Sequence, residues 1–287
     1  MEAPDFLVVG HVCRDVVDNG FSIGGTVVYA GLTASKLGRR VAIITSASSD
    51  LELASILPHI DIKVVESKES TTFHNTYSKA GRRQVIRSIA SPIPVSDIPD
   101  QWSKAEIVHL GPVAQELDPA LVTLFSSSLV GLTPQGWLRG WDDEGNVSYK
   151  EWAGASSILP YIDVLILSPE DVAEDESVIA RFSSQVPLLA LTQGELGATV
   201  HVEGEWHRIP AFPTKVKDRT GAGDVFAAAF LVYYEQTKAP IDAAFFANCV
   251  ASFCVEQPGI SGIPTWQQVR DRLRHAGMGY IVDRLGW

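Results

Sequence analysis

The sequence predicts an α/β protein built on a doubly wound, mainly parallel sheet. Short runs of continuous apolar and β-branched residues recur along the chain and alternate with segments of helical pattern. Such runs are typical of strands buried on both faces, and alternation with helices favours parallel pairing. The runs expected as strands are 6–10, 41–46, 62–65, 107–111, 129–133, 164–168 and 188–192.

Helical patterns and one hairpin fill the intervals between these strands. The segments 198–202 and 206–210 are expected to form an antiparallel hairpin, because a short Glu-Gly-Glu turn separates them. The expected helices are 27–37, 51–57, 119–127, 156–159, 172–184, a helix that begins near 224 and ends near 237, 241–256 and 265–276.

Two segments do not fit the parallel core. Residues 11–23 are of mixed polarity, and residues 71–89 alternate polar and apolar side chains, which is typical of a half-exposed antiparallel hairpin. We expect the two segments to pair as a small β lid over the carboxyl edge of the sheet, where folds of this class bind ligands. No long linker interrupts the chain, so 1–287 is predicted to be one domain. An exposed lid edge would allow a homodimer through strand pairing.

Composition narrows the classes of partner. The net charge of −11 argues against nucleic acid or an anionic membrane as partner, since both require a basic surface. There is no apolar run of membrane-spanning length and no signal-peptide pattern at the start. Three cysteines without a C-x-x-C pair favour a reducing, cytoplasmic setting and argue against structural zinc.

The segment 217–224, Lys-Asp-Arg-Thr-Gly-Ala-Gly-Asp, carries the strongest chemical signal. Glycine and alanine leave backbone N–H groups uncovered, and a helix that starts there directs those groups and its positive dipole end at an anion. Asp224 in the first turn would face the same space and suits a base for an attacking hydroxyl. The structural alternative is a glycine-rich turn with an acid that stabilises the helix start. A P-loop and a G-x-G-x-x-G start are both absent.

The longer string D-x-T-G-A-G-D resembles the signature of the ribokinase/pfkB carbohydrate kinase family. The resemblance implies a ribokinase-like fold and an ATP-dependent kinase that uses Mg²⁺. It also implies that Asp224 is the catalytic base and that the N–H groups of Gly221, Ala222 and Gly223 form the anion hole.

The resemblance extends to substrate and nucleotide positions along most of the chain. The early Gly-Gly and a preceding aspartate match the family's substrate-binding residues, although a simple turn and a surface carboxylate are the structural alternatives. The stretch 192–197 resembles the family's loop near the nucleotide, and its structural alternative is an ordinary loop between strand and hairpin. The implied substrate-binding residues are Asp15, Gly24 and Gly25, and the implied nucleotide-binding residues are Ser168, Thr192, Gly194, Gly197, Thr220, Asn248 and Gly259.

One departure concerns the metal. Where the family has N-x-x-E, this chain has Ser168-Pro169-Glu170-Asp171, so Asp171 is the expected holder of Mg²⁺ through water, with weaker or shifted use of the ion. Asp218, together with Thr220, is implied for a monovalent cation such as K⁺.

A second departure concerns the substrate. Tyr29 stands where sugar kinases often have a substrate-binding asparagine, and the segments 10–16 and 135–139 resemble the inositol-kinase branch. We therefore expect a kinase for a hydroxyl of a small sugar or a cyclitol such as myo-inositol. A non-catalytic nucleotide- or sugar-binding regulatory protein and a nucleoside or vitamin-precursor kinase are the alternatives.

Overall fold

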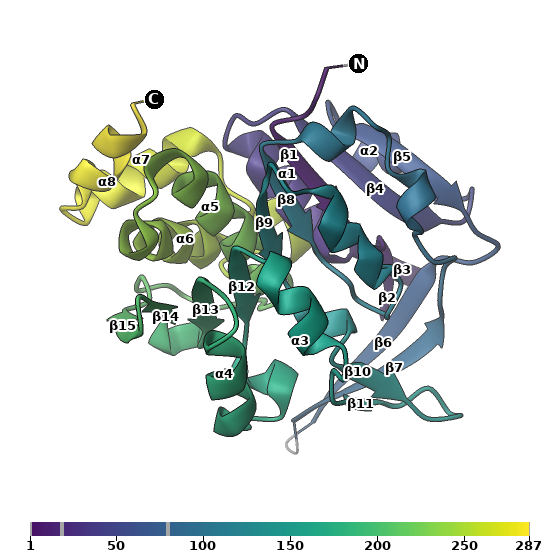
Figure 1. Cartoon of the computed structure of the whole chain (residues 1–287). Coiled ribbons are helices and arrows are strands. Elements are labelled where there is room, and N and C mark those ends of the chain that lie inside the picture. Colours follow the sequence, from purple (N-terminus) through teal and green to yellow (C-terminus); the bar gives the residue numbers. More distant parts are fainter. Residues whose placement is uncertain (1, 18–19, 79–80, 287) are drawn as a thin grey trace.

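A nine-stranded sheet forms the centre of the molecule. The computed structural model describes residues 2–17, 20–78 and 81–286 (Figure 1). The strand order is β15-β14-β13-β12-β9-β8-β1-β4-β5. These strands are β1 (Phe6–Val9), β4 (Val41–Ala47), β5 (Asp61–Glu66), β8 (Ile107–Leu110), β9 (Leu129–Leu132), β12 (Val164–Leu167), β13 (Leu188–Thr192), β14 (Ala198–Val202) and β15 (Glu205–Ile209).

The pairing confirms the predicted fold class. From β13 to β5 every neighbouring pair is parallel, and β14 and β15 add an antiparallel hairpin at one edge. All four residues of β1, β8 and β12 are buried, as expected for strands covered on both faces.

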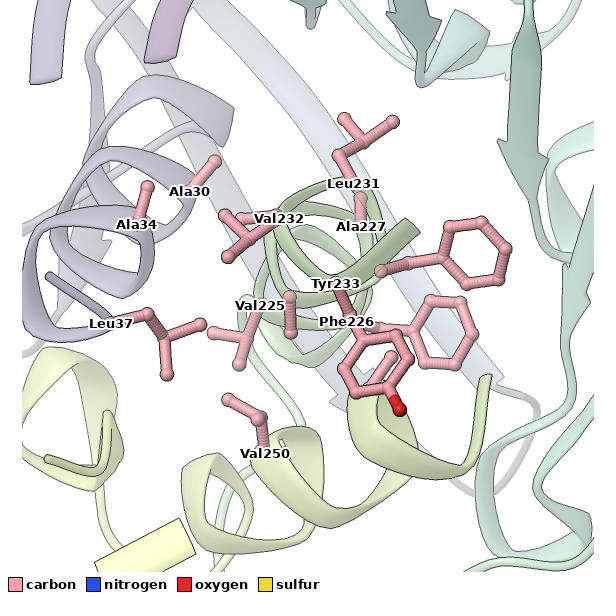
Figure 2. Packing of buried hydrophobic residues seen from close by; sticks show 14 of the residues in the cluster. Ala30, Ala34, Leu37, Val225, Phe226, Ala227, Leu231, Val232, Tyr233 and Val250 are labelled. Carbon is pink, nitrogen blue, oxygen red and sulfur yellow. The ribbon is translucent and has the colours of Figure 1, made fainter. Parts of the chain in front are cut away.

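Successive residues of each strand face opposite layers. Phe6 and Val8 point into one apolar cluster, and Leu7 and Val9 point into the other. The first cluster contains residues of α1 (Thr26–Lys36), α2 (Leu53–Ile56), α5 (Ala222–Thr237), α6 (Pro240–Cys254), α7 (Trp266–His275) and α8 (Gly279–Leu285). The second contains residues of α3 (Ala155–Ile158), α4 (Glu176–Ser183) and several 3₁₀ turns. Figure 2 shows α1, α5 and α6 meeting in the first cluster.

Short 3₁₀ turns connect many of these elements. They are η1 (Val95–Asp97), η2 (Trp102–Lys104), η3 (Pro119–Leu124), η4 (Pro134–Gly136), η5 (Leu159–Tyr161), η6 (Pro169–Val172), η7 (Gly194–Leu196) and η8 (Gly259–Gly262).

The helix predictions need three corrections. The segment predicted as a helix over 119–127 is the 3₁₀ turn η3, which Asp118 caps by accepting from the Ala120 N–H. The helix predicted over 172–184 starts only at Glu176, because Ala173 and Glu174 have φ values of 51° and 62° that no right-handed helix tolerates. Helix α8 was not predicted.

A second, four-stranded sheet lies beside the carboxyl edge of the large one. Its order is β3-β2-β6-β7, and we call it the small sheet. Its strands are β2 (Cys13–Val17), β3 (Gly20–Gly24), β6 (Thr71–Ser78) and β7 (Gly81–Ser88). The segments 11–23 and 71–89 do pair in it. The extent of the domain, 1–287, stays a prediction.

A buried histidine fastens the small sheet to the large one. The His11 ring lies 2.7 Å from the Thr71 hydroxyl through Nδ1 and 2.9 Å from the Ser91 carbonyl through Nε2. Thr71 also accepts a hydrogen bond from the Ala90 N–H at 3.0 Å. The end of β1 is therefore tied to both ends of the β6–β7 hairpin.

A short hairpin completes the region around the small sheet. It consists of β10 (Arg139–Trp141) and β11 (Val147–Tyr149), which pair antiparallel, and it lies next to β7 in Figure 1. In the described part of the chain, no helix has both the length and the apolar character needed to cross a bilayer.

Candidate active site

The start of α5 forms the centre of the candidate site. Gly221 precedes the helix with φ 75° and ψ 0°, a left-handed conformation that favours glycine. The first turn of a helix leaves N–H groups without partners inside the helix, and Gly221, Ala222 and Gly223 have no side chain larger than a methyl group to cover them. The N–H of Ala222 donates to the Arg219 carbonyl over a long 3.3 Å. The helix start is thus shaped as an anion cradle.

The ring of Tyr29 packs against Gly221 and so fixes the position of this cradle. A Cβ added to Gly221 would lie 2.2–2.4 Å from ring atoms of Tyr29, so no larger residue fits. Tyr29 is 2% exposed, and burial raises the pKa of its hydroxyl. Although its sequence position suggested a substrate contact, Tyr29 packs beneath the cradle.

Asp224 lies in the first turn of α5, next to Thr26 at the start of α1. Burial raises the pKa of its carboxyl to about 6, against a hydrogen bond from Thr26 and the positive charge of Arg139, and the charge of Asp171 adds to the rise. Thr26 fits there because Gly111 has no side chain; a Cβ on Gly111 would lie 2.3 Å from the Thr26 methyl. A half-buried carboxyl with a pKa near neutrality suits a general base.

Asp15 of β2 faces the same space from the small sheet. The Asn75 amide donates to Asp15 Oδ1 at 2.8 Å, and the Gln84 amide donates to Asn75 Oδ1 at 2.9 Å. The other carboxylate oxygen packs against Gly24, where a Cβ would lie 2.7 Å from it. This row of polar groups crosses β2, β6 and β7 and can bind hydroxyl groups.

Gly25 is the N-cap of α1 and turns the chain from the small sheet into the helix. Its φ of 92° and ψ of 154° are accessible to glycine alone, and a Cβ would lie 2.4 Å from the His11 carbonyl. Gly24 and Gly25 therefore let the small sheet and α1 approach closely enough for Asp15 and Asp224 to share one site.

Arg139, Thr26 and Asn75 also belong to the site, although the sequence did not predict them as site residues. Arg139 lies in the segment that resembled the inositol-kinase branch, and its guanidinium donates to the Val113 carbonyl at 3.3 Å. Thr26 directly follows the Gly-Gly pair, which was the available signal. No sequence signal pointed to Asn75, because alternating polar residues in a hairpin do not show which face is functional.

The expected metal position is a tightly hydrogen-bonded turn. Asp171 Oδ2 accepts from the Ser168 N–H at 2.8 Å and from its hydroxyl at 2.9 Å, and Oδ1 accepts from the Gln135 amide at 3.0 Å. Ser168 and Asp171 thus form a capping box, and the Asp171 charge acts on Asp224. No cluster of three metal-ligating side chains occurs among the residues that the structure describes.

Asp171 and its surroundings fit a hydrated Mg²⁺. They do not fit a metal site whose ligands all come from the protein. Mg²⁺ usually keeps several waters and binds one or two carboxylates together with substrate phosphates. Asp171 supplies one carboxylate beside Asp224, which matches that pattern.

Three of the expected nucleotide residues, Thr192, Gly194 and Gly197, lie between the end of β13 and the start of the following hairpin. The Thr192 hydroxyl donates to the Leu167 carbonyl at 3.3 Å. Gly194 and Gly197 have φ values of 57° and 94°, and Gly197 lies against the end of β15. The buried Asn248 amide donates to the carbonyls of Ile209 and Pro210, so this side chain fastens the chain after β15.

Asp218 joins the cradle to the loop after α6. Its carboxylate accepts from the N–H groups of Thr220 and Gly259, both at 2.9 Å. Burial alone would raise the pKa of Asp218, but these hydrogen bonds outweigh it and hold the pKa below its ordinary value. The cation roles of Asp218 and Thr220 stay predictions.

Comparison with known proteins agrees with this architecture. A family model described as "pfkB family carbohydrate kinase" matches residues 146–266. The chain is 26% identical over 279 residues to "Probable fructokinase-5" of Arabidopsis thaliana, covering 84% of this chain and 85% of that protein. It is 28% identical over 278 residues to "Inositol 3-kinase" of Oryza sativa subsp. japonica, covering 88% and 69%.

A solved structure with a similar fold has a TM-score of 0.78 and 25% identity, over 93% of this chain and 99% of that one. It is a "pyrophosphate-dependent kinase in the ribokinase family complexed with a pyrophosphate analog and myo-inositol". The fold is thus that of the ribokinase-type kinases. Over residues 146–266 the chain is also similar to the pfkB carbohydrate kinases.

Proposed function

We propose that this protein transfers the terminal phosphoryl group of ATP to a hydroxyl of a small sugar or cyclitol. The observation that carries the proposal is the position of Asp224, a carboxyl of raised pKa at the mouth of an anion cradle. A base and an anion site that share one helix turn can activate a hydroxyl and hold the group that it attacks.

The proposed catalytic step uses groups of this chain. Asp224 accepts the proton as the hydroxyl oxygen bonds to phosphorus, and the bond from phosphorus to the leaving phosphate oxygen breaks. The N–H groups at the start of α5 and the Arg139 guanidinium would stabilise the charge on the transferred group, about 3 kcal/mol for one well-placed donor. Mg²⁺, held on the phosphates and through water by Asp171, would neutralise the remaining phosphate charge.

The acceptor would lie between the two sheets. Asp15 and Asn75 are carboxylate and amide groups that recognise hydroxyls rather than an apolar ring. The small sheet would act as the lid that excludes water from the donor. The similarity to fructokinase and inositol kinase sequences supports this class of acceptor.

The proposed phosphoryl donor is ATP, with pyrophosphate as the alternative. The segment 192–197, Thr220, Asn248 and Gly259 are the proposed nucleotide-side residues, and Asp218 links two of them. The solved relative captured with a pyrophosphate analogue motivates the second donor.

A panel assay tests the proposal. Purified protein is incubated with Mg²⁺, with ATP or pyrophosphate, and with sugars, cyclitols and nucleosides, and the phosphorylated product is followed by ³¹P NMR. One sugar or cyclitol is expected to give turnover clearly above background. Turnover with nucleosides alone would show that the acceptor is a nucleoside and not a sugar or cyclitol. Binding of donor without any product would favour a non-catalytic regulatory protein.

A further inference from the structure

The β10–β11 hairpin docks its tip on the outer edge of the small sheet. The Ile86 N–H of β7 donates to the Gly145 carbonyl at 2.9 Å, and Val85 pairs with Asn146 in an antiparallel bridge. The Arg83 guanidinium donates twice to Asn146 Oδ1, at 3.1 Å from Nε and 2.5 Å from Nη2. Backbone and side chains thus both join the hairpin to β7.

The turn of the hairpin is shaped for this contact. Asp142 accepts from the Asn146 backbone N–H at 2.7 Å and from the Asn146 side-chain amide at 2.8 Å. These bonds turn Oδ1 of Asn146 towards Arg83. Gly145 has φ 81°, and a Cβ there would lie 2.3 Å from the Ile86 carbonyl. Only glycine permits so close an approach to β7 at this position.

Beneath the contact, the hairpin and the small sheet share an apolar cluster. Trp141 and Val147 of the hairpin pack with strand residues of the small sheet and with the loop after β8. The buried members of the cluster are Cys13, Phe73, Ile86, Val113 and Ala114. The cluster gives the docking a hydrophobic contribution besides the polar contacts.

The base of the hairpin is held at the active site. Arg139, its first residue, lies with its guanidinium carbon 5.6 Å from the Phe73 ring centre and donates to the Val113 carbonyl. The Gln115 amide donates to the Arg139 carbonyl at 2.5 Å, and Lys150 donates to the Gln115 side chain at 3.2 Å. One end of the hairpin is therefore fixed to Val113 and Gln115 in the loop after β8, from where the Arg139 charge acts on Asp224, and the other end is fixed on β7.

We propose that the β10–β11 hairpin is a strap that holds the small sheet over the site and keeps Arg139 beside Asp224, with Gly145 and Asn146 as positioning residues. The role in catalysis rests on the proposed kinase function. The docking itself does not, because it follows from contacts within this chain.

Gly145→Ala tests the strap, with Gly204→Ala as its matched control. Both glycines lie in hairpin turns at φ 81° and 83°, but a Cβ on Gly204 meets nothing within 4 Å. Both variants therefore carry the same backbone strain, and only Gly145→Ala displaces the strap. Asn146→Ala, which removes the acceptor for Arg83, is a second variant with less strain.

Amide exchange of Ile86, measured by NMR, reports docking without any substrate. We expect at least tenfold faster exchange in Gly145→Ala and a smaller increase in Asn146→Ala, with no change in Gly204→Ala. Unchanged exchange in both strap variants would overturn the docking. A wild-type protein without turnover would contradict the proposed function, while the exchange result would still decide whether the strap docks.

Kinetics test the positioning role. In Gly145→Ala we expect KM for the acceptor to rise about tenfold, more than kcat falls, and the acid limb of kcat/KM to move to higher pH as Arg139 leaves Asp224. Faster exchange with unchanged KM and unchanged pH profile would overturn the positioning role.

Discussion

At Asp224, the environment sets the protonation state on which the proposed chemistry depends. Burial disfavours the carboxylate, and Arg139 and Thr26 favour it, so the pKa lies at about 6. A base of this pKa is mostly ionised at neutral pH and still accepts a proton readily. Its exact value depends on the one cationic side chain that the hairpin brings to the site.

The pH profile of kcat/KM should therefore show an acid limb near pH 6. Activity is expected to fall about tenfold per pH unit below that limb, because the protonated carboxyl cannot act as base. Arg139→Met should move the limb to higher pH, whereas Arg181→Met, far from the site on α4, should not. A flat profile down to pH 4.5 would contradict the role of Asp224.

Gly221 and Gly223 should respond differently to alanine. Gly221→Ala forces a Cβ into the Tyr29 ring at a left-handed φ and is expected to lower the unfolding free energy by about 3 kcal/mol. Gly223 has open space around it in the first turn of α5, so Gly223→Ala should leave stability unchanged or raise it by about 0.5 kcal/mol. Urea unfolding of both variants checks this, and equal losses would show that Tyr29 does not fix the cradle.

Residue-level prediction from the sequence succeeded where local geometry and chemistry coincide. Gly221 and Asp224 are three residues apart along the chain, so a turn and a helix start suffice to bring them together. Arg139 and Asn75 reach the site through the docking of distant segments. No local pattern in the sequence encodes that docking.

Among the elements, α5 is the most deeply embedded. Every residue from Val225 to Tyr233 is buried, and α5 lies between α1 and α6 (Figure 2). On the side of the sheet, Leu231 packs on Gly131 of β9. An anion cradle at the end of such a helix cannot shift without disturbing the core. Its N–H groups are thus held in place before any ligand binds, which is what electrostatic stabilisation requires.

The loop after β8 is organised by a buried carboxylate. Glu116, 3% exposed, accepts from the N–H groups of His11, Val113 and Ala114 at 2.7–3.0 Å. It joins the ends of β1 and β8 directly below the small sheet. Each of these N–H groups would be buried without a partner if the carboxylate were lost.

Glu116→Gln should destabilise the protein by about 2 kcal/mol, because an amide has one accepting oxygen in place of two. Thermal and urea unfolding measure the loss, and Glu144→Gln, on the exposed hairpin turn, is the control. A Glu116→Gln variant as stable as the control would show that the carboxylate does not organise this loop.

Element-level prediction failed where short-range backbone geometry overrides apolar pattern. Most strands of the large sheet were found because runs of four apolar residues, as in β1 and β12, have few other interpretations in an α/β chain. The expected helix over 172–184 was too long because the left-handed residues Ala173 and Glu174 are not marked by glycine or proline. Proline at position 119 starts a 3₁₀ turn and an α-helix equally well.

At the scale of the whole molecule, two sheets together build one site. The large sheet and α5 supply the base and the anion cradle, and the small sheet supplies the polar row of Asp15 and Asn75. The alternation of strands and helices predicted the large sheet, and the change to half-exposed alternation predicted the small one. How the two sheets approach each other could not be predicted, because it depends on Gly24, Gly25 and the hairpin at 139–149.

The central claim is that this site transfers a phosphoryl group with Asp224 as base. The most direct test is the rate of phosphoryl transfer, measured by rapid quench, for wild type, Asp224→Asn and Glu176→Gln. Glu176 is an acid in the first turn of α4, so its variant controls for the loss of charge at a helix start.

Asp224→Asn is expected to lose about 10³-fold in transfer rate while it binds the donor as tightly as wild type in calorimetry. The unfolding temperature of the variant should also be no lower than that of wild type. Because burial raises the pKa of Asp224 in the folded protein, ionisation of this carboxyl lowers the free energy of unfolding as the pH rises from 3.8 to about 6. Glu176→Gln should transfer at the wild-type rate. Transfer by Asp224→Asn at the wild-type rate would contradict the account.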